Sequence, residues 1–169
     1  MKKIITILLL LIVTLPVFAA NTQMKLELGV QNTDISLNYK GNTGNVKFNA
    51  KTDLNLNVVF DGKNGFNLVF APDLTGNSFV VGGGYVLQTK VGNSTKLLVS
   101  AGPRINVKSS TWSLGADVSA SLHLDLTSKM YLAISTGTEI YLAEFRNGET
   151  KAYLDLTIPL PRIAIGYTF

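Results

Sequence analysis

The chain has 169 residues, contains no cysteine and carries a formal net charge of +4. The missing cysteines exclude disulfides, a lipoprotein anchor, thiolate metal sites and cysteine nucleophiles. The charge is too mild for nucleic-acid binding, which requires a concentrated basic stripe.

The first twenty residues have the three parts of a secretory signal peptide. Lys2 and Lys3 form a basic start, residues 4–13 are apolar apart from one threonine, and small residues follow. This apolar run is shorter than the roughly 20 residues that a transmembrane helix needs. We therefore predict that residues 1–20 are removed by cleavage after Ala19 or Ala20, which lowers the net charge to +2.

Residues 21–169 form one domain with the period-2 pattern of β-strands. Between Ser113 and Leu126, apolar residues from Leu114 onward occupy every second position, and polar residues or glycine occupy the positions between them. A run of this length exceeds the usual strand of a soluble sheet, about 5–6 residues. The sequence therefore predicts long strands with two different faces.

Turn residues separate these strands. Seven turns divide the domain into eight segments, approximately 22–40, 45–60, 65–71, 78–90, 94–108, 110–126, 129–146 and 150–169. Long hairpins with short connections predict an all-β, closed, antiparallel up-and-down barrel, because closure removes exposed strand edges.

The apolar pattern shifts by one residue inside the first and the last segment. Each shift indicates either a bulge or a turn, and Pro159 and Pro161 favour a bulge in the last strand. Paired bulges give eight strands, which we favour; two turns would give ten.

The orientation of the two faces separates a membrane barrel from a soluble one. A soluble periplasmic lipid-binding barrel places its apolar face inside, and a transmembrane barrel reverses this. The polar faces are rich in glycine and serine with few charges, which suits a narrow lumen filled by side chains. Aromatic residues near the strand ends predict two belts, one with Tyr39, Phe70, Phe79, Trp112, Phe145 and Tyr153, the other with Phe60, Phe66, Tyr131, Tyr167 and Phe169.

The chain ends in an alternating apolar strand, residues 163–169, that finishes on Phe169. This ending resembles the C-terminal signature of bacterial outer-membrane barrels, in which Tyr167 and Phe169 would be recognised by the assembly machinery. In architecture the mature chain is similar to small barrels of the OmpA transmembrane domain, OmpX and OmpW type. The resemblance implies a location in the bacterial outer membrane and contact with its lipid.

The polar faces contain one candidate functional cluster. Arg104 and Lys96 on one strand can pair with Asp117 and Asp125 on the next, and Glu139 lies one strand further. Because buried charges must be paired, we predict a salt-bridged and largely plugged lumen. The predicted lumen residues are Lys96, Arg104, Asp117, His123, Asp125 and Glu139.

Enzymatic and metal chemistry find little support. Ser121, His123 and Asp125 alternate on one strand, but steps of about 7 Å keep them out of mutual hydrogen-bond contact. One histidine without cysteine excludes the common zinc sites, and Gly82–Gly84 lack the lysine and helix of a phosphate loop. We expect no enzyme activity and no cofactor.

Three functional hypotheses remain: a structural or surface barrel with a plugged lumen, a narrow channel for ions or small apolar molecules, and a soluble periplasmic carrier. The expected partners are outer-membrane lipid and the export and barrel-assembly machinery, with no nucleic acid, and we expect a monomer.

Overall fold

The computed structural model describes residues 22–38, 43–74, 78–146, 148–159 and 161–169, with side chains described outside residues 31–50, 153 and 159. The predicted signal peptide lies outside these ranges. The described part is β-structure throughout. Its strands are β1 (Thr22–Asn38), β2 (Thr43–Phe60), β3 (Asn64–Pro72), β4 (Ser78–Gly92), β5 (Thr95–Lys108), β6 (Thr111–Asp125), β7 (Met130–Arg146), β8 (Glu149–Pro159) and β9 (Arg162–Thr168).

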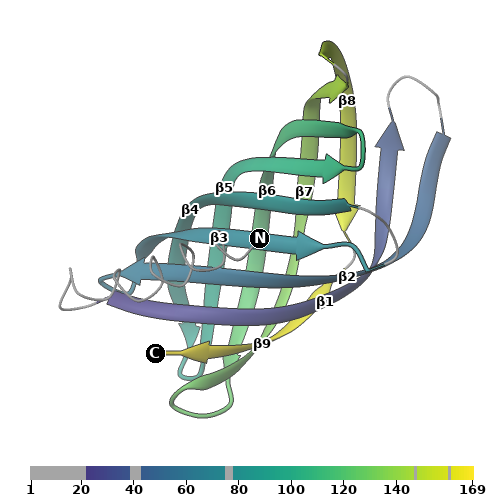
Figure 1. The fold of residues 1–169 in the computed structure, drawn as a ribbon. Helices are drawn as coiled ribbons and strands as arrows, with labels where there is room; N and C mark the ends of the chain where they lie inside the picture. Colours follow the sequence, from purple (N-terminus) through teal and green to yellow (C-terminus); the bar gives the residue numbers. More distant parts are fainter. Residues whose placement is uncertain (1–21, 39–42, 75–77, 147, 160) are drawn as a thin grey trace.

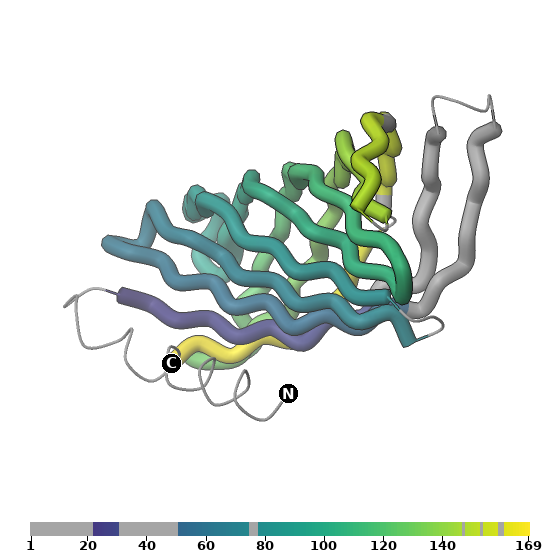
Figure 2. The backbone as a smooth tube through the Cα atoms, turned by 45° about the horizontal axis from the view of Figure 1, so that its top comes forward, coloured from purple at the N-terminus to yellow at the C-terminus, as the bar shows by residue number. Residues whose placement is uncertain are grey.

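Consecutive strands from β1 to β8 pair antiparallel, and the ring is closed by β1, which pairs with β2 on one side and with β8 and β9 on the other. Figure 1 shows this arrangement, and Figure 2 shows the strands side by side in the wall. β8 and β9 occupy one position in the ring because both pair with β7 and β1. The ring therefore has eight positions, as predicted, and the ten-stranded alternative is wrong.

The two predicted irregularities lie opposite each other. The β1–β2 register shifts between Gln31 and Thr33. On its other side β1 pairs with β9 up to Val30 and with β8 from Asp34 onward. The break between β8 and β9 thus faces the bulge in β1. Two matched irregularities keep the ring at eight strands, because a bulge on one strand shifts the register that its neighbour must follow.

The apolar face of the sheet points outward. On β6, Leu114 and Val118 are 41% and 56% exposed, whereas Asp117 and His123 are 7% and 1% exposed. Leucine, valine and isoleucine side chains on the outside of most other strands are similarly exposed. A soluble carrier requires the opposite orientation, so this alternative is wrong. An exposed apolar band around a closed ring is the surface that lipid covers.

Aromatic rings form pairs near both ends of the wall. At one end Phe70 lies against Phe79, and Trp112 stacks on Phe145 with ring centroids 3.8 Å apart. At the other end Phe60 lies against Phe66, and Tyr167 against Phe169. Two predicted belt residues lie outside the described part of the structure: Tyr39 entirely, and Tyr153 with its side chain.

Tyr131 was wrongly predicted to belong to a belt. It is 2% exposed and faces the lumen. Its position follows from alternation with Glu139, which lies on the same face of β7 at an even separation. The side of the strand, rather than the distance from its end, decides whether an aromatic residue meets lipid.

We call one end of the barrel the terminal rim, because β1 begins and β9 ends there, and the other end the opposite rim. The terminal rim carries Thr22, Thr168 and the turns 61–63, 93–94 and 126–129, and the opposite rim carries the turn 109–110 and the turn at Gly148. Among the described residues, the structure contains no helix of the length and apolar character needed to span a bilayer.

Candidate functional site in the lumen

Glu27 of β1 lies at the centre of a buried polar layer that crosses the lumen. Its side chain is 1% exposed. The Oε1 atom accepts hydrogen bonds from Asn57 Nδ2 at 3.0 Å and from the Tyr131 hydroxyl at 3.2 Å, and it lies 3.2 Å from His123 Nε2. Strands from opposite sides of the ring thus converge on one carboxylate.

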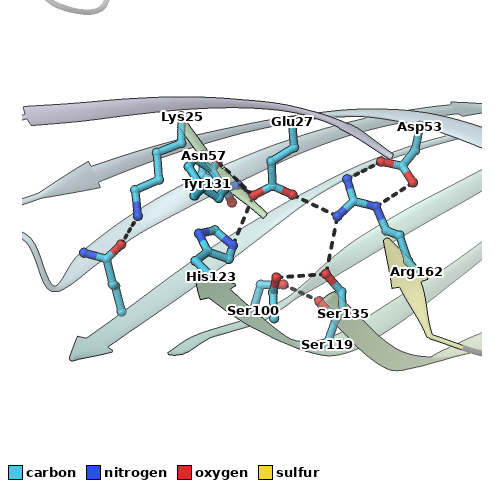
Figure 3. A network of polar contacts seen from close by, with 12 residues as sticks. Lys25, Glu27, Asp53, Asn57, Ser100, Ser119, His123, Tyr131, Ser135 and Arg162 are labelled. Atoms are coloured by element: carbon cyan, nitrogen blue, oxygen red, sulfur yellow. Dashed lines mark hydrogen bonds and ion pairs between the residues drawn. The ribbon is translucent and has the colours of Figure 1, made fainter. Parts of the chain in front are cut away.

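Arg162 of β9 joins this carboxylate to a second one. Its NH1 donates to Glu27 Oε2 at 2.8 Å, and its Nε donates to Asp53 Oδ2 at 2.6 Å. NH1 also lies 3.3 Å from the hydroxyl of Ser135. We call Glu27, Asp53, Asn57, His123, Tyr131 and Arg162 the Glu27 layer (Figure 3).

Two glycines make room for the large side chains of the Glu27 layer. A Cβ atom on Gly29 would lie 2.5 Å from Arg162 Nε, and one on Gly166 would overlap the ring of Tyr131. Gly166 and Tyr131 are direct cross-strand partners, so the ring lies across the bare backbone of β9. The layer therefore depends on residues without side chains as much as on its charged groups.

The lumen between the Glu27 layer and the terminal rim is basic. Lys25 is 1% exposed; its ammonium group donates to Gln88 Oε1 and lies 5.7 Å from the centroid of the Tyr131 ring. Gln88 Nε2 donates in turn to the carbonyl of Gly62 in a terminal-rim turn, at 3.0 Å. Closer to this rim, Lys96 Nζ lies 2.7 Å from Asp125 Oδ2.

A second ion pair lies on the other side of the Glu27 layer, toward the opposite rim. Arg104 Nε lies 2.8 Å from Asp117 Oδ1, and both side chains are nearly buried. Glu139 lies directly across from Asp117 in the β6–β7 ladder and accepts a hydrogen bond from the Tyr141 hydroxyl at 3.1 Å.

Residues of the Glu27 layer and of the Arg104–Asp117 pair line a chamber of about 110 Å³. Hydroxyl groups form part of its wall, with Ser100 bonded to Ser119 and Ser121 bonded to Ser135. Valine and leucine side chains of β3 to β5 form another part. A polar chamber of this volume has room for several water molecules.

The structure places the six predicted lumen residues on the inner face. It brings Lys96 to Asp125 and Arg104 to Asp117, and it places His123 against Glu27. Glu139 lines the chamber beside Asp117. The six predicted residues therefore form three separate groups along the barrel axis and not one network.

The predicted lumen residues left out Lys25 and five members of the Glu27 layer, which are Glu27, Asp53, Asn57, Tyr131 and Arg162. Lys25 and Glu27 alternate with Met24, Leu26 and Leu28, so the period-2 pattern of β1 already placed them inside. Arg162 lies directly after the break between β8 and β9. The apolar alternation restarts there, so it does not predict which face of the sheet Arg162 occupies.

Ser121, His123 and Asp125 do not form a catalytic triad. Ser121 is hydrogen-bonded to Ser135, His123 contacts Glu27 and stacks on Tyr131, and Asp125 pairs with Lys96. Among the described residues, no three histidine, aspartate or glutamate side chains lie close enough to hold a metal ion.

The last residues continue the outer face. Tyr167 and Phe169 pack edge to face with centroids 5.0 Å apart, and the backbone N–H of Phe169 donates to the carbonyl of Met24. Phe169 is therefore paired with β1 near the start of that strand.

No protein-family model matches the sequence, and no curated protein matches it. Solved structures do match. Neisserial surface protein A has 9% identity, with a TM-score of 0.55 over 88% of this chain and 97% of its own. Ail, the attachment invasion locus protein of Yersinia pestis solved with the heparin analogue sucrose octasulfate, has 12% identity, with a TM-score of 0.57 over 88% and 99%. The N-terminal β-barrel domain of Pseudomonas aeruginosa OprF has 10% identity, with a TM-score of 0.57 over 88% and 98%.

These similarities establish the fold. The chain has the architecture of the small outer-membrane β-barrels, with an apolar belt outside and a polar lumen inside. The resemblance predicted from the sequence is confirmed at the level of fold. At such low identity the functions of these proteins do not transfer with it.

Proposed function

We propose that the mature chain is an integral protein of the bacterial outer membrane with a structural or surface role and a plugged lumen. The observation that carries the proposal is the Glu27 layer, in which side chains from five strands meet around one buried carboxylate. Such a layer would narrow the path for hydrated ions, because large side chains that contact one another extend across the lumen. We propose no enzymatic activity.

The remaining parts of this proposal concern how the chain reaches the membrane. Export would use residues 1–20 as a signal peptide, and assembly would use the terminal strand with Tyr167 and Phe169. Sequencing the N-terminus of protein isolated from outer membranes tests the first part, and a first residue other than Ala20 or Asn21 would contradict it. Deletion of Phe169 tests the second, since the variant should accumulate unassembled. We further propose a monomer surrounded by lipid, because the closed ring has no free edge along its wall.

Single-channel conductance of the mature chain in planar bilayers tests the plug. Insertion is established separately by the gel mobility difference between heated and unheated samples. We expect protein that is inserted to remain silent. Discrete openings from inserted wild-type protein would refute the plugged lumen.

The chamber favours a second candidate function, a narrow channel for ions or small apolar molecules. This channel would require the Glu27 layer to open. Conductance that appears only under voltage or on addition of a solute would select it over the structural role.

A further inference from the structure

We propose that the chamber beside the Glu27 layer binds a small neutral polyol, for which glycerol is the model compound. The proposal rests on the second candidate function for its role in transport, because it names the class of small molecule that a narrow channel through this barrel would accept. Binding itself requires only the folded barrel.

One side of the chamber carries pairs of serine hydroxyls that keep spare hydrogen-bonding capacity. Ser100 Oγ lies 2.7 Å from Ser119 Oγ, and Ser135 donates to Ser121 at 2.8 Å (Figure 3). Ser135 also accepts from Arg162, so the Ser100–Ser119 pair has the larger spare capacity. A hydroxyl has one donor and two lone pairs, and the bond within a pair uses one of each, so this pair keeps one donor and three lone pairs for a molecule in the chamber.

The facing side of the chamber is apolar. It is lined by Val69 and Ala71 of β3 and by Val80 of β4. β3 and β7 lie on opposite sides of the eight-position ring, so the apolar side chains of β3 look across the chamber toward Ser135. A molecule that fits both sides has hydroxyl groups along one edge and a carbon chain along the other.

The charged side chains of the wall contact other protein groups and favour a neutral occupant. Arg104 is paired with Asp117, Glu139 accepts a hydrogen bond from Tyr141, and Arg162 bridges two carboxylates of the Glu27 layer. An ion that entered would lose hydration while the charges around it were already engaged, which is unfavourable. A neutral polyol loses only hydrogen bonds to water, and the serine hydroxyls replace these.

The volume of the chamber selects a short polyol over a long one. At about 30 Å³ for each water molecule, a chamber of about 110 Å³ holds roughly three or four of them. Glycerol replaces a similar volume of water, whereas sorbitol, which has twice as many carbon and oxygen atoms, exceeds it. Displaced water is compensated when the incoming molecule reproduces its hydrogen bonds, as glycerol does on the serine side.

Saturation-transfer NMR of glycerol with the refolded wild-type barrel in neutral detergent is the test, with empty detergent micelles as the baseline. We expect transfer from the protein to glycerol and none to sorbitol at equal concentration. Absence of transfer to glycerol would leave water as the only occupant of the chamber and would refute the site. Equal transfer to both compounds would refute it as well, because the chamber would then not select by size.

A double variant and a matched control locate the polyol. Ser100→Ala combined with Ser119→Ala removes both hydroxyls of one pair, so neither is left without its partner and the barrel should fold. We expect glycerol binding to weaken about ten-fold, which corresponds to about 1.4 kcal/mol. Ser109→Ala combined with Ser110→Ala makes the same chemical change in the exposed turn at the opposite rim and should leave binding unchanged. Equal weakening in the two double variants, or wild-type binding in both, would contradict the proposal.

Conductance and glycerol binding are measured independently, so the plug and the polyol site fail separately. Ions that pass through the inserted wild-type barrel would refute the plug and leave glycerol binding standing. Glycerol that fails to bind would refute the site and leave a silent barrel standing.

Discussion

The Glu27 layer and the chamber share the strands β1, β2, β6, β7 and β9 but are filled differently. In the layer, Gly29 and Gly166 leave space that Arg162 and Tyr131 occupy. In the chamber, the inner faces of β3 to β7 present serine and valine, which are too short to meet across the ring. The placement of glycine opposite long side chains therefore decides which part of this eight-stranded lumen is filled by side chains and which part contains a cavity.

We expect the largest loss of stability from a substitution of Glu27, at the centre of the Glu27 layer. Glu27→Ala leaves the guanidinium of Arg162 with one carboxylate and removes the acceptor for Tyr131 and Asn57. Removing one partner from a buried ion pair costs about 3–5 kcal/mol. We expect a large loss in the free energy of unfolding in lipid, measured by urea titration, and channel openings in the protein that still inserts. Glu149→Ala, at an exposed rim position, is the control. Wild-type stability together with silent bilayers would show that the layer is not what closes the lumen.

The next largest loss of stability is expected from a substitution that fills the space beside Tyr131 and leaves the charges of the Glu27 layer unchanged. Gly166→Ala places a methyl group where the Tyr131 ring lies, and overpacking of this kind costs about 1–3 kcal/mol. The displaced ring should also lose its hydrogen bond to Glu27. Thermal melting in detergent measures the loss. The control is Gly92→Ala, whose Cβ would meet only Thr95 at ordinary contact distance. Equal melting temperatures for the two variants would remove the argument that glycine defines the layer.

The fold was predictable from the sequence because alternation and turn residues are local signals. All eight segments agree with the observed strands within a few residues, including the matched break that keeps the ring at eight. The Lys96–Asp125 and Arg104–Asp117 contacts also follow from local pairing of adjacent strands.

The centre of the site was not predictable in the same way. Glu27 and Arg162 are 135 residues apart, and they meet only because closure brings β1 beside β9. The bulge at Leu142 was missed as well. Tyr141 lies inside and Phe145 outside although both are odd-numbered, because the register shifts between Tyr141 and Ala143. No residue there carries a turn or proline signal.

A smaller effect is expected in the chamber. Glu139 accepts a hydrogen bond from Tyr141 and lies opposite Asp117, so its removal both takes away this hydrogen bond and relieves a like-charge neighbour. We expect Glu139→Ala to destabilise the barrel moderately, by about 1–2 kcal/mol, or to raise its permeability to small ions. Melting and liposome efflux measure the two outcomes. Glu139→Gln, which keeps a hydrogen-bond acceptor, should restore most of the stability. A variant unchanged in both melting and permeability would contradict a role for Glu139 in the lumen.

The smallest effect belongs to the ion pair nearest the terminal rim. The side chains of Lys96 and Asp125 are 22% and 29% exposed, so water and salt screen their attraction. A partly exposed pair of this kind contributes less than about 1 kcal/mol. Asp125→Asn should therefore lower the melting temperature only slightly, and the difference should shrink as salt is raised. Asp117→Asn makes the same change in a pair that is 8% and 7% exposed and should cost several times more, with little dependence on salt. If the two variants lose equal stability and respond equally to salt, burial does not distinguish the two pairs, and water must reach the Arg104–Asp117 pair as freely as it reaches the terminal rim.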